Sequence, residues 1–143
     1  MRFLMHEVLQ KVSNAKTKKE KIKLLQEMNS NALRMLLIIN FDDSVISMLP
    51  AGDVPYTPND APEGTEHTIL EKEARLLHHF FKGGSNVSQV KREQMFVQML
   101  EGLNKGEAEA LVLAKDKRIG KRWKITKATV TEAFPAIVWG NRS

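Results

Sequence analysis

Apolar residues recur at helical spacing along nearly the whole chain. Near the N-terminus, Met5, Val8 and Val12 fall at intervals of three and four residues, which places them on one face of an amphipathic helix. Alternation of apolar and polar residues never extends far enough to predict a regular strand, although residues 123–125 and 137–139 could be extended. The pattern therefore predicts an all-α fold of about six or seven short helices.

Capping signals mark where these helices begin and end. Thr17 and Glu20 form a capping box, in which the threonine oxygen accepts an early helical N–H and the glutamate reaches back to the cap residue. Glycine is expected to end helices at Gly83 and near Gly120, because it adopts the left-handed backbone common at helix ends. The expected helix starts are Met5, Thr17, Asn29 or Ser30, Thr68, Asn86, Asn104 and Thr126.

The apolar stripes of the later helices supply the expected core of the C-terminal half. Leu77 and Phe81 share one face of the helix that begins near Thr68. Val90 is expected on the buried face of the following helix, and Leu111 and Phe134 lie on the inward stripes of the last two. These side chains are therefore predicted to be buried.

Residues 50–64, PAGDVPYTPNDAPEG, contain four prolines and two glycines and cannot form a regular element. The segment is too long for a plain connector, so it is expected to be either a binding loop or a mobile one. Its acidic residues disfavour direct contact with phosphates. We expect a solvent-facing excursion from a single helical domain that spans residues 1–143.

Composition narrows the classes of function. The chain has no cysteine, which excludes disulfides, thiolate catalysis and cysteine-ligated zinc. No signal-peptide pattern is present, and the most apolar stretch, MLLIINF, is far shorter than the ~20 residues needed to span a bilayer. We therefore expect a cytoplasmic protein that does not enter membranes.

Candidate catalytic and metal-binding residues do not assemble into a motif. The neighbouring His78 and His79 point about 100° apart on a helix, so they cannot both face one metal ion. Residues 82–86, KGGSN, lack the spacing and the terminal lysine of a phosphate-binding P-loop. No nucleophile–base pair is visible. The sequence thus predicts a protein that is not an enzyme and that needs no cofactor or metal.

Charge is distributed unevenly along the chain, whose formal net charge is +5. Residues 11–23 hold six lysines against one acid, and residues 115–127 hold seven basic residues against one acid. Between them, residues 42–73 hold eight acids against one lysine. Two basic zones around an acidic middle can steer a polyanion towards one face of the protein, although the same lysines could also be solvated helix faces.

The basic stretch 115–127 leads into the helix that Thr126 is expected to cap. The start of that helix exposes unpaired N–H groups and a partial positive charge, which suit a phosphate oxygen. Lysine, arginine and threonine side chains can hold neighbouring phosphates. Nothing in the stretch has the form of a recognition helix with side chains aimed at base edges. We therefore expect binding to the DNA backbone with little sequence preference.

The same stretch resembles the N-terminal DNA-binding domain of ATP-dependent DNA ligases, especially the short form in tailed-phage ligases. Those domains are all-helical. They end with an acid-Ala-x-x-Leu helix, a basic Arg-x-Gly turn and a short Thr- or Ser-capped helix that closes on Phe-Pro or Trp-Pro. The corresponding residues here are 109–113 (EALVL), 116–120 (DKRIG), 125–130 (ITKATV) and 133–135 (AFP). The upstream helices follow the same order, so the likeness covers about residues 20–138.

The chain departs from the ligases in one decisive respect. In a ligase this domain precedes an adenylation domain with a Lys-x-Asp-Gly motif, and this sequence contains neither. In the family, the N-terminal domain lies across the minor groove around a nick and contacts mainly sugars and phosphates. The resemblance therefore implies a non-catalytic module that grips double-stranded DNA, nicked or intact.

Eight residues are the expected DNA contacts. Four match the turn and the cap of the ligase motif: Arg118, Gly120, Lys121 and Thr126. Four more are inferred from charge alone: Lys117, Arg122, Lys124 and Lys127.

The alternative is a phage-type protein-interaction factor that uses the ligase-like helical scaffold to bind a host replication or transcription protein. The acidic residues 42–73 favour this alternative, because they could dock a basic partner. A phage-encoded protein of either kind would act in the host cytoplasm.

Overall fold

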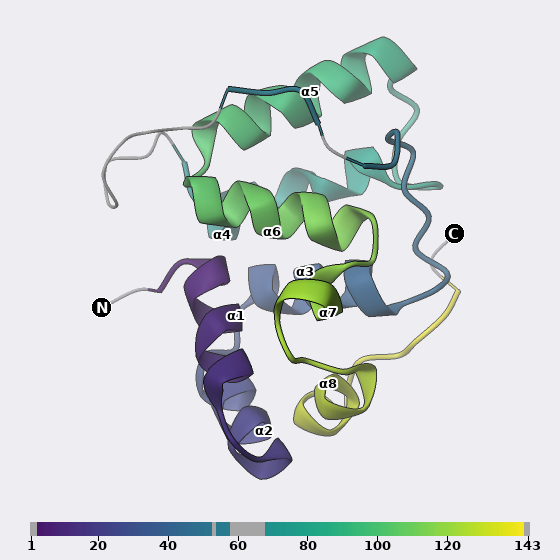
Figure 1. Cartoon of the computed structure of the whole chain (residues 1–143). Coiled ribbons are helices and arrows are strands. Elements are labelled where there is room, and N and C mark those ends of the chain that lie inside the picture. Colours follow the sequence, from purple (N-terminus) through teal and green to yellow (C-terminus); the bar gives the residue numbers. More distant parts are fainter. Residues whose placement is uncertain (1–2, 53, 58–67, 142–143) are drawn as a thin grey trace.

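The computed structural model describes residues 3–52, 54–57 and 68–141 (Figure 1). These residues form eight α-helices and one 3-10 helix, with no strand among them and one isolated bridge between Ser47 and Phe81. The all-α prediction is confirmed, with eight α-helices where the sequence predicts six or seven. The elements are α1 (Met5–Asn14), α2 (Lys18–Glu27), α3 (Asn31–Phe41), α4 (Leu70–Glu73), the 3-10 helix η1 (Ala74–Phe80), α5 (Gln89–Gly102), α6 (Lys105–Lys115), α7 (Ile119–Arg122) and α8 (Lys127–Ala133). No helix in these ranges is long and apolar enough to cross a membrane.

Side-chain caps define the starts of several helices as predicted. Thr17 Oγ1 accepts the Glu20 N–H at 3.2 Å at the start of α2, and Ser30 Oγ accepts the Leu33 N–H at 3.1 Å at the start of α3. Asn104 caps α6 and Thr126 caps α8 in the same way. These caps depend on neighbouring residues only, which is why the sequence predicts them correctly.

The helix predicted from Thr68 differs from expectation in both its cap and its period. Its N-cap is Ile69, which makes no side-chain cap, and after four residues α4 continues as η1. A 3-10 helix has three residues per turn, so the residue that follows Leu77 on the buried face is three positions later. Phe80 is therefore fully buried, and the prediction for Phe81, which is only partly buried, is wrong.

Helix α5 begins two residues later than predicted, with Ser88 in place of Asn86 as its cap. The buried guanidinium of Arg92 fixes this start by donating to the carbonyls of Val87 at 3.1 Å and His79 at 2.9 Å. Val90 lies in the first turn on the opposite side and is 68% exposed, so its predicted burial is wrong.

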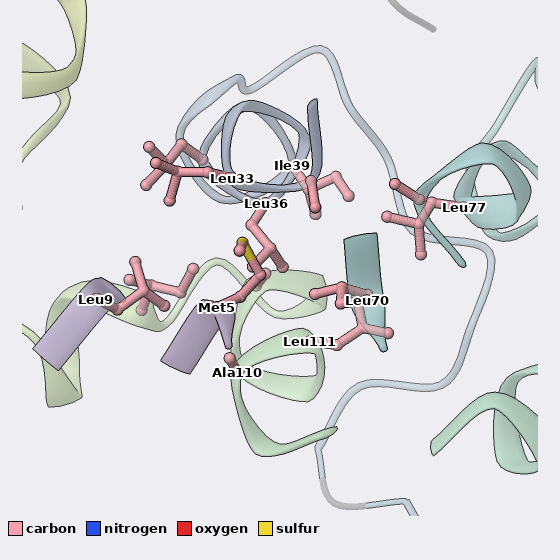
Figure 2. Close-up of a cluster of buried hydrophobic side chains, with 14 of the residues drawn as sticks. Met5, Leu9, Leu33, Leu36, Ile39, Leu70, Leu77, Ala110 and Leu111 are labelled. Carbon is pink, nitrogen blue, oxygen red and sulfur yellow. The ribbon is translucent and has the colours of Figure 1, made fainter. Parts of the chain in front are cut away.

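The buried side chains form one contiguous cluster to which all the long helices contribute. Figure 2 shows part of this cluster, with labelled side chains from α1, α3, α4, η1 and α6. The carboxylate of Glu107, in the first turn of α6, lies inside this cluster with 1% exposure. One of its oxygens accepts the Met5 N–H of α1 at 2.8 Å, and the other accepts the Leu70 N–H of α4 at 3.0 Å. A single buried carboxylate thus satisfies the first turns of two further helices.

Helix α6 ends in a Schellman turn at Lys117, before the end near Gly120 that the sequence predicts. The Arg118 N–H donates to the Leu113 carbonyl at 2.8 Å and the Lys117 N–H donates to the Ala114 carbonyl at 3.0 Å. Lys117 occupies the left-handed position with φ 59°. Gly120, predicted to end this helix, lies within α7 instead.

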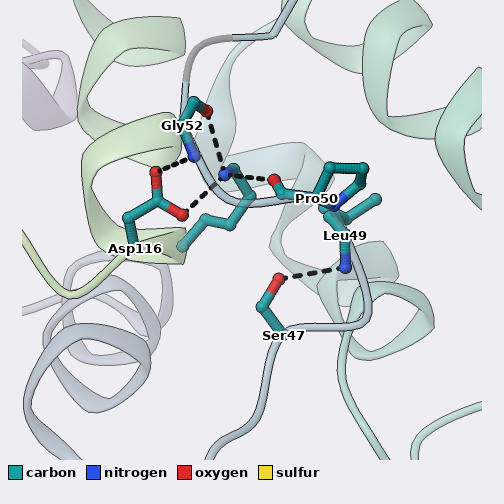
Figure 3. Close-up of polar contacts among 6 residues, drawn as sticks. Ser47, Leu49, Pro50, Gly52 and Asp116 are labelled. Carbon is teal, nitrogen blue, oxygen red and sulfur yellow. Dashed lines mark hydrogen bonds and ion pairs between the residues drawn. The ribbon is translucent and has the colours of Figure 1, made fainter.

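Lys115 fixes the segment that follows α3 against the end of α6 (Figure 3). Its buried ammonium donates to the carbonyls of Pro50 at 2.9 Å and Gly52 at 3.2 Å and to Asp116 Oδ1 at 2.7 Å. Of the predicted loop 50–64, residues 50–52 and 54–57 are described and form no helix or strand. The rest of that loop, including its acids Asp53 and Asp60, lies outside the described residues.

Candidate nucleic-acid interface

The two basic segments, far apart in the sequence, meet where α2 lies beside α8 (Figure 1). Lys21 Nζ donates to the Lys124 carbonyl, and the Lys124 N–H donates to Ser13 Oγ at 2.9 Å. Lys18 Nζ lies 3.0 Å from Glu132 Oε2 of α8. We use the term basic surface for the lysines and arginines of residues 16–23 and 118–127, which these contacts bring together.

Three of the predicted contact residues present unengaged cations on this surface. Arg118, Lys121 and Lys124 are exposed, and within the described ranges their side chains make no hydrogen bond or ion pair. Lys19 of α2 is exposed in the same way. These four side chains can meet phosphates without breaking a contact of the fold.

Arg122, Lys127 and Lys18 are exposed but engaged. The Arg122 guanidinium pairs with the Glu109 carboxylate and lies 4.9 Å from the ring centre of the buried Trp123. Lys127 Nζ lies 5.1 Å from the ring centre of Trp139. Exposed pairs of this kind are weak, so a phosphate can compete for each of these cations.

The side chain of Lys117 has a structural role. Its ammonium donates to the carbonyls of Ile39 at 2.8 Å and Asp42 at 2.7 Å, at the C-terminus of α3. Partial burial lowers the pKa of Lys117, while the nearby carboxylates of Asp43 and Asp42 act in the opposite direction. Because this ammonium points into the protein, we leave Lys117 out of the proposed interface.

Thr126 has a local structural role, and Gly120 has no structural role that requires glycine. Thr126 Oγ1 accepts the Thr129 N–H at 3.3 Å and so caps α8, which has only seven residues. A Cβ built at Gly120 would lie 3.7 Å from the Ile125 carbonyl, an ordinary contact, so the backbone does not require glycine there. Neither residue adds a charge to the basic surface.

Sequence reasoning did not connect the N-terminal lysines with the C-terminal turn. The lysine run itself is plain in the sequence, but the contacts between Lys21 and Lys124 and between Lys18 and Glu132 span more than 100 residues. Buried Trp123 also contributes, because its Nε1–H donates to Gln10 Oε1 of α1 at 3.1 Å and fixes α1 beside residues 123–124.

His78 and His79 lie in η1, away from this surface. The rings of His78 and His79 are 4.0 Å apart, and His79 Nδ1 lies 2.9 Å from Ser85 Oγ. Desolvation lowers the pKa of His79, and the neighbouring His78 and Lys91 lower it further. Within the described ranges, no group of three or more His, Asp or Glu side chains is placed to hold a metal ion.

Comparison with protein families identifies a relationship that covers most of the chain. The model of DUF6433, a family of unknown function, matches residues 8–121, which is most of the chain. No curated protein and no solved structure matches significantly.

Proposed function

We propose that this chain, which belongs to the DUF6433 family, is a non-catalytic module that binds duplex DNA through its sugar-phosphate backbone. The basic surface makes the contacts, and sequence preference is small because the surface offers charges and no array aimed at base edges. The protein acts in the cytoplasm, which is the host cytoplasm if a phage encodes it. The resemblance of residues 109–135 to the DNA-binding domain of ligases belongs to this proposal.

The observation that carries the proposal is the junction of two basic segments. The contact between Lys21 and Lys124 brings the N-terminal lysines beside the segment that joins α7 to α8. Several unengaged cations on one surface attract a polyanion, and the DNA backbone presents about one negative charge per 1.7 Å of duplex. A single basic helix face would offer fewer cations and would attract DNA less strongly.

Fluorescence anisotropy with labelled nicked and intact duplexes of several sequences tests this proposal. At ~50 mM salt the protein should bind all of them with similar affinity. If about five phosphates are contacted, the logarithm of the association constant should fall against the logarithm of the salt concentration with a slope of about −4.5. No AMP should be transferred from ATP to the protein.

Single-residue variants separate the basic surface from charge elsewhere. Lys121→Ala, Lys124→Ala and Arg118→Ala should each weaken binding to every duplex alike and flatten the salt slope by about one unit. Lys19→Ala should do the same, because α2 shares the surface. The matched control is Lys91→Ala, an exposed lysine on α5 at the other end of the molecule, which should bind as the wild type does (Figure 1).

A wild-type protein that binds no duplex at ~50 mM salt would refute the proposal. The basic surface would then be a solvated face or a protein-docking surface, and the interaction-factor alternative would take the place of DNA binding. Loss of binding in Lys91→Ala equal to that in Lys121→Ala would also count against the assigned surface.

A further inference from the structure

The C-terminal segment places a tryptophan beside the basic surface. The Trp139 Nε1–H donates to Thr131 Oγ1 of α8 at 3.1 Å, and the Thr131 hydroxyl donates to the Lys127 carbonyl at 2.8 Å. Lys127 Nζ lies 5.1 Å from the centre of the indole ring. Because Lys127 and Thr131 are both exposed, the indole lies along the outer side of α8.

The backbone on either side of Trp139 is fixed. The Ile137 N–H donates to the Phe134 carbonyl at 3.1 Å, and the Gly140 N–H donates to Asp42 Oδ2 at 3.0 Å. Gly140 has φ 94°, a conformation that glycine adopts readily and that turns the chain towards α3. Trp139 is therefore held in place from both sides, and its position is defined relative to Lys127.

The two tryptophans of the chain have different environments. Trp123 is 2% exposed and belongs to the core, whereas Trp139 remains partly exposed. Proteins that bind single-stranded nucleic acid combine a positive surface with aromatic side chains, because every base has a face on which it can stack. Trp139 supplies such a ring beside the cation of Lys127.

We propose that Trp139 stacks on an unpaired base, so that the preferred ligand of the basic surface is duplex DNA containing a short single-stranded gap. This inference rests on the proposed function. The base replaces the Lys127 ammonium over the indole, and the released ammonium meets a flanking phosphate. The exchange is favourable because a cation–π contact at an exposed site is weak. Bases of an intact duplex are already stacked on their neighbours and offer no free face.

Intrinsic tryptophan fluorescence and anisotropy test the inference with a gapped duplex and the same duplex without a gap, at one salt concentration. The gapped duplex should bind roughly tenfold more tightly, the effect expected of one stacked base, and should quench the emission of Trp139. Trp139→Phe should keep most of the preference, because phenylalanine also stacks. Trp139→Leu should lose the preference and the quenching, since the remaining Trp123 is buried.

Affinity for the intact duplex is the internal control. Trp139→Leu should bind the intact duplex at least as tightly as the wild type does, and its melting temperature should show that it is folded. Equal affinity of the wild type for both duplexes, or a preference that survives Trp139→Leu, overturns the inference and leaves the proposed function standing. Absence of binding to either duplex overturns the proposed function and this inference together.

Discussion

Lys117 holds a left-handed backbone conformation with φ 59°, which costs a residue with a Cβ roughly 1–2 kcal/mol. Its side chain compensates for this cost, because the ammonium donates to the carbonyls of Ile39 and Asp42 at the C-terminus of α3. A cation is favourable there, since the end of a helix carries partial negative charge. One residue therefore joins the end of α6 to the end of α3.

The two roles of Lys117 can be separated by two substitutions. Lys117→Ala removes the ammonium and keeps the Cβ, so it should be less stable than the wild type. Lys117→Gly also removes the ammonium but relieves the left-handed strain, so it should be more stable than Lys117→Ala by about 1 kcal/mol. Urea unfolding of the three proteins measures both differences. Equal midpoints for the two variants would show that backbone strain at this position is negligible.

At the scale of elements, the contact between α2 and α8 forms both part of the core and the basic surface. Phe134, the residue that ends α8, is 7% exposed, and Leu111 of α6 is 1% exposed, so the predicted burial of both is confirmed. The Gln26 side chain of α2 donates to the Ala133 carbonyl at 3.1 Å. The packing of α2 against α8 and this hydrogen bond hold the two basic segments beside each other.

Phe134→Ala should therefore destabilise the fold by about 3–5 kcal/mol, the usual cost of removing a buried phenylalanine side chain. Thermal or urea unfolding measures the effect. Val138→Ala is the control, because Val138 is also apolar and close in sequence but is 70% exposed, and its effect should be within about 0.5 kcal/mol. Similar melting temperatures for wild type and Phe134→Ala would mean that burial of Phe134 does not hold α8 in place.

Breaking the ion pair between Lys18 and Glu132 should have little effect on stability but should strengthen DNA binding. Both side chains are more than half exposed, so Glu132→Gln should change the free energy of unfolding by less than about 1 kcal/mol. The same change frees the Lys18 ammonium and removes a negative charge, so duplex DNA should bind more tightly. The salt slope should become steeper by up to about 0.9 if Lys18 gains a phosphate contact. Weaker DNA binding by Glu132→Gln would contradict the proposed position of the DNA.

At the scale of the whole molecule, local signals in the sequence located several helix starts, although the expected caps at Thr68 and Asn86 and the expected helix end near Gly120 were wrong. The caps at Thr17, Ser30, Asn104 and Thr126 each depend on residues within a single turn, and all four were predictable. The 3-10 period of η1 was not, because apolar residues at both Phe80 and Phe81 fit a helical stripe and only tertiary packing selects one of them.

In the candidate site, too, the sequence showed local features but not long-range contacts. Its basic residues were visible as charge runs, but their partners were not, because Lys117 bonds to Ile39 and Lys21 bonds to Lys124 across long stretches of chain. A lysine in the left-handed position also breaks the usual association of helix ends with glycine. Sequence composition therefore indicated which residues were cationic, and only the fold showed which of them were already engaged.

The carboxylate of Glu107 has a consequence for the order in which the chain folds. Its two oxygens complete the first turns of α1 and α4, and the bond to Met5 spans 102 residues. During synthesis, α1 leaves the ribosome long before Glu107 is made, so its first turn lacks this partner until α6 has been translated. Loops this long close late, because their entropic cost precedes the contacts that offset it. Helix α1 is thus synthesised well before the residue that completes its first turn.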